Sequence, residues 1–181
     1  MPFAARISVA LFVAGSLSLA AGPAAHAQGS CTGASATLGA GNLGQVERAT
    51  LCLINAQRRA RGLGRLQVNR LLRKAALRHS RDMVHKRYFD HTSPGGQTFL
   101  DRIRDSGYLL RARSWNVAEN IAWGQGPFGT PSGIVRAWMN SPPHRHNILT
   151  AGFRSIGVGI APGNPRSGSR GATYTTDFGS R

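Results

Sequence analysis

The sequence predicts an α+β fold in which helices pack on a small antiparallel sheet. Apolar residues recur at the three- and four-residue spacing of helices through the first part of the chain. Near the C-terminus, the runs 156–161 and 172–178 are instead typical of two β-strands joined by a basic, glycine-containing loop. Because helices come first and most strands last, we expect one domain with helices packed on a sheet, and no internal repeat is visible.

Three helices are expected before residue 110. The first spans about 43–61. The second follows Asn69, which suits a helix N-cap, and runs to about Lys86. The third spans about 98–106. The apolar face of the second helix has the spacing of a buried helical face and consists of Leu72, Ala75, Ala76, His79 and Met83.

A strand and a fourth helix complete the expected elements. The run 117–123 is typical of a short buried strand. A helix beginning near Ile134 is expected to stop at Pro142-Pro143, because proline breaks a helix interior.

The first 27 residues have the features of a secretory signal peptide. Arg6 supplies a positive charge, residues 7–21 form an uncharged apolar core, and Ala25-His26-Ala27 fits an A-x-A cleavage site. The core is shorter than a membrane span of roughly 20 residues, and a retained N-terminal anchor is the alternative interpretation. We expect cleavage after Ala27, a flexible arm at 28–42, one folded domain at 43–181, and no transmembrane segment in the mature protein.

Two cysteines are present, Cys31 and Cys52. In an oxidising compartment they are expected to form one disulfide between the arm and the first helix. The chain-entropy model gives such a closure about 3 kcal/mol of stabilisation.

The chain is strongly basic, with 23 Lys and Arg against 7 Asp and Glu and a formal net charge of +16. Such a surface attracts anionic polymers or lipid headgroups. Specific nucleic-acid binding is not expected, because the chain lacks interleaved aromatic platforms. Arginine richness from genomic base composition is the alternative explanation, so charge alone does not assign a function.

Glu119 stands out because acids are scarce and its neighbours are apolar. A carboxylate in a buried strand must be paired, hydrogen-bonded or metal-bound, since an isolated buried charge costs several kcal/mol. The turns that carry His91 and His144 are its natural partners. Known nucleophile and phosphate-loop motifs are absent, and Ser93 and Ser141 have no evident Ser-His-Asp arrangement.

Six stretches in order resemble the bacterial branch of the CAP superfamily, which includes cysteine-rich secretory, antigen five and pathogenesis-related proteins with an SCP-like domain. The stretches cover about 46–179 and are 53–59, 75–83, 89–96, 118–122, 138–149 and 156–159, closing on Phe178-Gly179. The resemblance implies an α-β-α sandwich with a small antiparallel sheet between helical layers and an open cleft. His91, Glu119 and His144 match cleft residues of the family, whereas Ser141 stands where many relatives carry a second Glu.

The resemblance leaves two chemical interpretations of these residues open. His91 and His144 are candidate ligands for zinc or another divalent metal, with Glu119 as candidate general base. Alternatively the residues form a polar network without metal, in which Glu119 fixes the tautomer of His91. The other candidates for the cleft are Ser141, Asn147 and His79, and His79 is equally compatible with a satisfied core histidine.

The leading hypothesis is a secreted or extracytoplasmic protein that binds an anionic envelope polymer, a lipid or another extracellular ligand in a His- and Glu-lined cleft. Association with the cell wall is an option within this hypothesis. The alternative is a metal-dependent hydrolase acting on peptide or cell-wall bonds.

Overall fold

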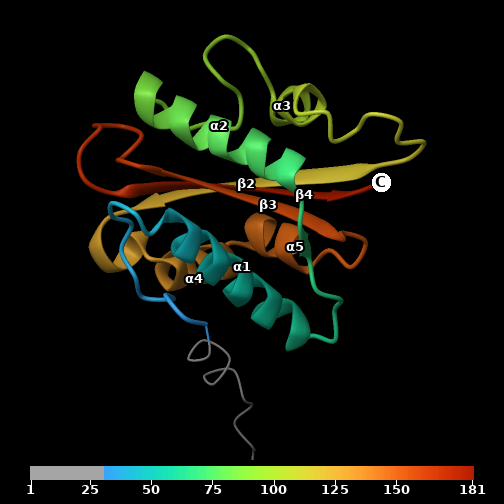
Figure 1. The fold of residues 1–181 in the computed structure, drawn as a ribbon, viewed down its shortest axis with the longest axis horizontal. Coiled ribbons are helices and arrows are strands. Elements are labelled where there is room, and N and C mark those ends of the chain that lie inside the picture. Colours follow the sequence, from blue (N-terminus) through green and yellow to red (C-terminus); the bar gives the residue numbers. More distant parts are fainter. Residues whose placement is uncertain (1–30) are drawn as a thin grey trace, which may run out of the picture.

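The computed structural model describes residues 31–181, and the expected signal peptide at 1–27 lies outside this range. Two helices, α2 (Arg70–Lys86) and α3 (Phe99–Asp105), cover one face of a four-stranded sheet. The helices α1 (Leu43–Arg59), α4 (Pro131–Asn140) and α5 (Pro142–Leu149) cover the other face (Figure 1). The predicted α+β class and α-β-α layering are confirmed.

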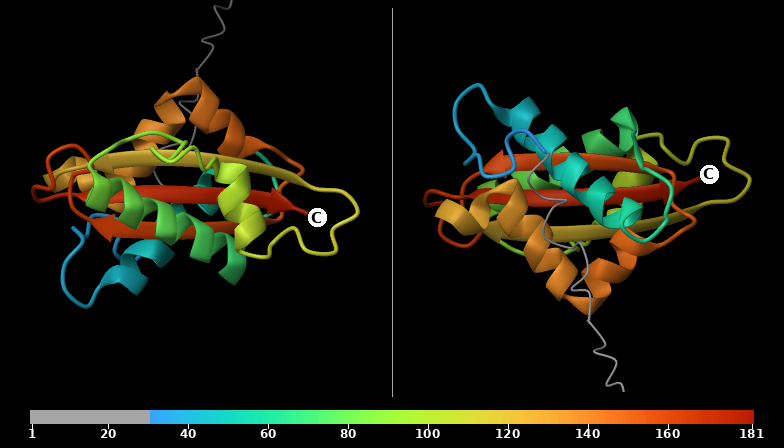
Figure 2. Two further views of the ribbon diagram at one scale, coloured as in Figure 1. Left: turned by 90° about the horizontal axis from the view of Figure 1, so that it is seen from above. Right: turned by 90° about the horizontal axis from the view of Figure 1, so that it is seen from below.

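The sheet has the strand order β1-β3-β4-β2. Its strands are β1 (Gln67–Val68), β2 (Asn116–Gly124), β3 (Ser155–Pro162) and β4 (Ala172–Ser180). The three long strands are antiparallel, as expected, whereas β1 pairs in parallel with β3 and was not predicted. The strand β2 therefore forms one edge of the sheet, between the two helical layers (Figure 2).

The expected cap sets the beginning of α2, and a cap that was not predicted sets the beginning of α3. The side chain of Asn69 accepts hydrogen bonds from the backbone amides of Leu71 and Leu72, and Thr98 forms a capping box with Asp101. All five residues of the predicted apolar face of α2 are buried, including His79. Local sequence signals thus predict where α2 begins and which of its faces is buried.

The helix α4 ends at Asn140, as expected from the stop at Pro142-Pro143, but a second helix that was not predicted begins at Pro142. Pro142 and Pro143 occupy the first positions of α5, where a missing backbone N–H removes no intrahelical bond. A short 3₁₀ helix, Gly126–Gly129, lies between β2 and α4. The helix α5 matters for function because it carries His144 and Asn147 beside the edge strand.

The α2 layer lies unusually close to the sheet. Side chains on β3 alternate between the two faces, and the positions that face α2 include Gly157 and Gly159. A Cβ atom on either glycine would overlap the α2 backbone, at Arg73 and Leu77 respectively. The glycines therefore allow the helix to rest directly on the strand, and most apolar packing lies on the opposite face, with Ile156, Val158, Ile160, Tyr174 and Phe178 in the main core.

A buried arginine ties the end of α1 to the chain that follows α5. The Arg58 side chain is fully buried, forms no ion pair within residues 31–181, and donates to four backbone carbonyls. Its acceptors are Gly64 at 2.8 Å, Ile148 at 2.7 Å, Thr150 at 2.9 Å and Phe153 at 3.4 Å. Burial lowers the pKa of Arg58, with a smaller contribution from the nearby Arg154 charge. This network fixes the position of α5 relative to the sheet.

The first residues that the structure describes are tied to α1 by the expected disulfide. Cys31 and Cys52 form the predicted disulfide. Ala34, Ala36 and Leu38 pack against the main core, although residues 31–42 contain no helix or strand. None of the helices between residues 31 and 181 is long and apolar enough to span a bilayer.

We predict that Gly159→Ala lowers the free energy of unfolding by about 3 kcal/mol or more, because the added methyl group must push α2 away from β3. Gly152→Ala is the matched control, since its Cβ would meet no atom within 4 Å. Urea denaturation of both variants measures the difference. Equal stabilities would show that the close packing of α2 on β3 is not a constraint on the fold.

Candidate functional site

Glu119 lies in the middle of β2 with its side chain toward the α2 and α3 layer. Its side chain is only 1% exposed. Its backbone carbonyl points away from the sheet and accepts a hydrogen bond from the Asn147 side chain at 3.3 Å. In an antiparallel ladder, an outward-facing carbonyl marks a non-hydrogen-bonded pair, whose side chains are close together. Glu119 pairs in this way with Asp177 of β4, so two carboxyl groups are neighbours on one face.

Arg102 of α3 is the main partner of Glu119, and sequence reasoning missed it. Its Nη2 atom lies 3.1 Å from Oε1 and 2.9 Å from Oε2 of Glu119. The same guanidinium donates to the backbone carbonyls of His91 at 2.7 Å and Gln97 at 3.0 Å. Arg102 is 2% exposed, so this is a buried ion pair that also holds the loop between α2 and α3. The only sequence signal was its position beside Ile103, on the expected inner face of the helix.

His91 completes the environment of the Glu119 carboxylate. Its Nδ1 atom lies 2.8 Å from Oε1 of Glu119. An ionised carboxylate can only accept hydrogen bonds, so Nδ1 carries the proton. The His91 side chain is 47% exposed, in contrast to its buried partner. Glu119 thus contacts an imidazole that reaches the surface, which is the contact required by one of the two interpretations that the sequence leaves open.

His79 of α2 is the third histidine near this carboxylate, and it is fully buried. Its Nε2 atom lies 3.0 Å from the Asp90 carbonyl and 3.8 Å from Oε1 of Glu119. Burial lowers the pKa of His79 to about 4 and outweighs the opposing attraction of Glu119. His79 is therefore neutral at neutral pH, and it is a hydrogen-bonded core histidine.

Tyr88 connects His79 to the helix surface. Its hydroxyl donates to Asp82 at 2.7 Å and lies 3.0 Å from the Ser93 hydroxyl and 3.3 Å from Nδ1 of His79. Burial raises the pKa of Tyr88 to about 12, so the hydroxyl keeps its proton. Asp82 also pairs with Lys86 at 2.8 Å. This network joins His79 and Asp82 of α2 to Ser93 of the loop that follows the helix.

The charge state of Glu119 follows from these contacts. Burial alone would raise its pKa, but the hydrogen bond from His91 and the interactions with His79 and Arg102 outweigh burial and lower it. Because His79 is neutral at neutral pH, Arg102 and His91 supply the stabilisation there. Glu119 is consequently an ionised carboxylate whose oxygens are already engaged, which makes it a weak proton acceptor.

Asp177 has the opposite character. It is 1% exposed, and neither carboxyl oxygen has a hydrogen-bond partner among the described residues. Burial raises its pKa well above the ordinary range, and the neighbouring negative charge of Glu119 raises it further. The cross-strand pair thus contains one ionised and one protonated carboxyl group. Sequence reasoning missed Asp177 because only the strand register places it opposite Glu119.

The remaining predicted site residues lie on α5 and at its beginning. Nδ1 of His144 lies 2.7 Å from the Ser141 hydroxyl. Burial lowers the pKa of His144, and the charge of His91 adds to this effect. Asn120 of β2 donates to the His144 carbonyl at 3.0 Å and accepts from the Asn147 amide at 2.9 Å. These contacts hold α5 against the edge strand.

The structure therefore joins His79, His91 and Glu119 in one cluster and links Asn147 to the backbone of Glu119. Ser141 and His144 form a second pair on the α5 side, without a direct contact to the Glu119 carboxylate among the described residues. The small cavity beside the cluster opens on the α2 side, with a volume of about 120 Å³. Its lining includes His79, Ser93 and Arg102 but neither Glu119 nor His144.

The donors around this cluster do not fit a resident zinc ion. Between residues 31 and 181, no three His, Cys, Asp or Glu side chains are grouped closely enough to hold one metal. Glu119 is neutralised by Arg102, which leaves His91 and His144 as two candidate ligands. Catalytic zinc sites use three protein ligands and structural sites four.

Comparison with known proteins identifies this arrangement. The model of the cysteine-rich secretory protein family, CAP, matches residues 51–177. The chain belongs to the CAP family. The matched range begins in α1 and ends in β4, so it includes every residue of the Glu119 cluster.

Several relatives and solved structures resemble this CAP domain. The chain is 42% identical over 113 residues to the uncharacterized protein YkwD of Bacillus subtilis (strain 168), a match that covers 62% of this chain and 41% of YkwD. It is 30% identical over 114 residues to the uncharacterized membrane protein YlbC of the same strain, covering 63% and 31% of the two chains. The chain thus spans less than half the length of either relative.

Two solved structures share the fold. An extracellular protein containing an SCP domain from Bacillus anthracis str. Ames superposes with a TM-score of 0.60 at 26% identity, over 78% of this chain and 44% of that one. An outer surface protein from Borrelia burgdorferi has a TM-score of 0.59 at 23% identity, over 72% and 89% of the two chains.

We predict that Asp177→Asn stabilises the CAP domain increasingly as pH rises above about 4. The unfolded chain loses the Asp proton near pH 3.9, whereas the folded protein retains it to higher pH. Wild-type stability therefore falls between the unfolded and folded pKa values, and asparagine removes this loss.

Thermal unfolding of both proteins from pH 4 to pH 8 measures the effect. The difference between variant and wild type cancels contributions from other titrating groups such as His79. A difference that shrinks or reverses with rising pH would show that ionised Asp177 stabilises the fold, contrary to this assignment.

Proposed function

We propose that this CAP domain acts outside the cytoplasm as a binding protein for an anionic envelope or extracellular ligand. The observation that carries the proposal is the engagement of Glu119 by Arg102 and His91, at 2.9 Å and 2.8 Å. A general base needs a free lone pair directed at substrate and a pKa near the working pH. Glu119 is buried, paired and has a lowered pKa, so its role is to position Arg102 and His91.

The Ser141–His144 pair does not supply a hydrolase mechanism either. A serine nucleophile needs hydrogen-bond donors for the developing oxyanion, and the two residues after Ser141 are prolines, which supply no N–H group. The triad arrangement also requires a carboxylate on the second imidazole nitrogen. No carboxylate between residues 31 and 181 forms an ion pair with His144. This pair therefore supports a binding or bracing role.

The extracytoplasmic location rests on three supporting observations. Residues 1–27 have signal-peptide features, a disulfide joins Cys31 and Cys52, and the related SCP-domain protein of Bacillus anthracis is described as extracellular. Association with the cell wall is the further part of the proposal, supported by the net charge of +16. The ligand class is an anionic polymer or lipid.

We predict that the protein without residues 1–27 co-sediments with isolated envelope fractions at low salt and that binding weakens as salt is raised. Electrostatic attraction to a polyanion is screened within about 8 Å at physiological ionic strength. The double variant His91→Asn with His144→Asn tests the surface next to the Glu119 cluster, and His146→Asn is a control on the same helix. Failure of the wild type to bind at any salt concentration would end this proposal.

Metal analysis of the same proteins tests the alternative, a metal-dependent hydrolase acting on peptide or cell-wall bonds. We expect the purified protein to carry no stoichiometric zinc or other divalent metal. Stoichiometric metal that is lost in the His91→Ala, His144→Ala double variant would instead favour the hydrolase.

A further inference from the structure

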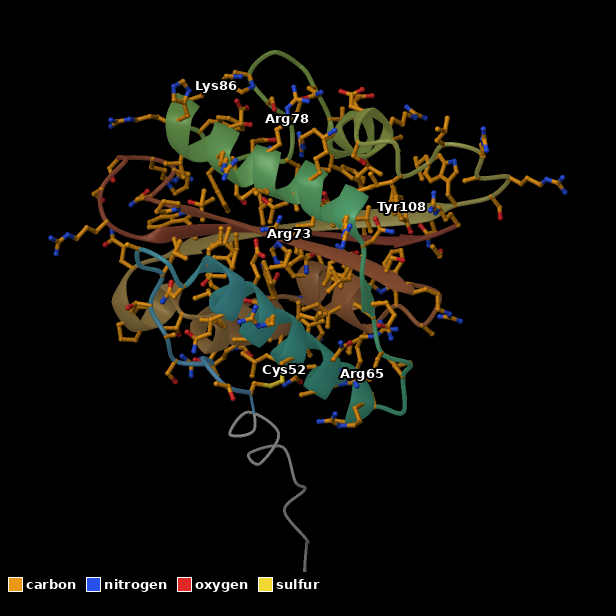
Figure 3. All side chains as sticks on the ribbon, viewed as in Figure 1. Cys52, Arg65, Arg73, Arg78, Lys86 and Tyr108 are labelled. Atoms are coloured by element: carbon orange, nitrogen blue, oxygen red, sulfur yellow. A yellow bond between two sulfur atoms is a disulfide. The ribbon has the colours of Figure 1, made fainter. Side chains whose placement is uncertain are left out.

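The solvent-facing side of α2 carries a line of cations that the site described above does not use. Arg70, Lys74, Arg78 and Arg81 are all exposed and follow one another at spacings of four, four and three residues. Residues at these spacings lie on one face of a helix, and at 1.5 Å per residue the line is about 16 Å long. A groove of about 540 Å³ follows the same side chains. Figure 3 labels Arg73, Arg78 and Lys86 along this helix.

These four cations differ from their neighbours in having no acidic partner. On the same helix, Arg73 pairs with Glu47 at 2.9 Å and Lys86 pairs with Asp82 at 2.8 Å. Within residues 31–181, none of the ion pairs includes a member of the line. Like charges at these spacings repel one another and destabilise a helix. An anionic ligand would remove this repulsion.

The groove continues toward the buried cluster. Arg78 and Asp82 line both the groove and the cavity of about 120 Å³ next to it. The cavity is also lined by Lys86, Ser93 and Arg102. The Nε–H of Arg102 is buried and has no hydrogen-bond partner among the described residues, although both Nη atoms are engaged. A buried donor without a partner is costly, so an oxyanion that reached this N–H group would remove that cost.

We infer that the α2 line (Arg70, Lys74, Arg78 and Arg81) and the Arg102 cavity form one docking track for a linear, phosphate-bearing polymer. The polymer lies along α2, and its terminal phosphate enters the cavity between Arg78 and Arg102. A terminal phosphate carries nearly two negative charges at neutral pH. Of the cations that line the cavity, Lys86 pairs with Asp82 and Arg102 with Glu119, whereas Arg78 forms no ion pair within residues 31–181 and is the charge that attracts the phosphate. Guanidinium groups bind such oxyanions through paired hydrogen bonds. The docking track assigns a ligand class and a binding surface to the proposed function. This inference therefore rests on that function.

A membrane surface fits this face less well. Helices that lie on membranes combine basic residues with an apolar side that enters the lipid. The large exposed apolar side chains of the described residues are Val68, Leu110, Trp115, Trp123 and Phe128, and none of them belongs to α2. A single line of charges in a groove matches an extended chain better than a plane.

The experiment compares two variants that each lose four positive charges. The first carries Arg70→Gln, Lys74→Gln, Arg78→Gln and Arg81→Gln. The control carries Arg48→Gln, Arg59→Gln, Arg61→Gln and Arg65→Gln, which are exposed cations on or just after α1, on the other side of the sheet. Calorimetric titration with linear polyphosphate at several salt concentrations gives the affinity and its salt slope.

We expect the α2 variant to lose at least about tenfold in affinity. The slope of log K against log salt should fall by roughly 3, since each lost phosphate contact removes slightly less than one unit. The control should keep the wild-type slope to within about one unit. Equal losses in both variants would show a general charge effect and overturn the assignment. If polyglutamate bound as tightly as polyphosphate, the preference for phosphate would be overturned. If the protein bound phosphatidylglycerol vesicles but not polyphosphate, the assignment of a linear polymer as the ligand would be overturned.

The Arg102 Nε–H resonance in NMR spectra tests the cavity directly. It should shift when polyphosphate is added to the wild type, and an unmoved resonance in the bound complex would overturn entry into the cavity.

Envelope binding separates this inference from the proposed function. If the α2 variant binds envelope fractions like the wild type while the His91, His144 variant does not, the track fails and the proposed function stands. If the wild type itself does not bind envelope, the proposed function fails.

Discussion

The buried ion pair between Arg102 and Glu119 is the interaction on which the site depends. Both side chains are almost completely removed from water, and removing either partner would leave an uncompensated buried charge, which typically costs about 3–5 kcal/mol. The pair joins α3 to the edge strand, and the same guanidinium holds the carbonyls of His91 and Gln97. One charged contact therefore fixes a helix, a strand and the loop that presents His91.

Burial keeps the ionisable groups next to the pair neutral. His79, with its pKa lowered to about 4, adds no charge to the buried cluster at neutral pH. Asp177 sits opposite Glu119 in the sheet and retains its proton because burial and then the negative charge of Glu119 raise its pKa. In this arrangement the Glu119 and Arg102 charges are paired, and His79 and Asp177 are neutral. The arrangement is better suited to holding a surface in shape than to moving protons during turnover.

Sequence reasoning identified the parts of the structure that depend on local patterns. The inner face of α2, the Asn69 cap and the need for a partner to Glu119 all follow from residues close together in the chain. The partner itself could not be found in this way, because any of 23 basic residues could have supplied it. Asp177 escaped for a related reason, since only strand register places it beside Glu119. The helix α5 was missed because a proline pair ends one helix and begins the next equally well.

Measuring the ionisation of Glu119 tests the role of the Arg102–Glu119 ion pair most directly. Carbon-13 labelling of glutamate side chains allows the Glu119 carboxyl signal to be followed by NMR as the pH is lowered through the folded range. We expect Glu119 to take up its proton at a pH below the ordinary range for glutamate, because Arg102 and His91 stabilise the ionised form more than burial disfavours it. Protonation of Glu119 at or above neutral pH would contradict this assignment and would make the residue a general base.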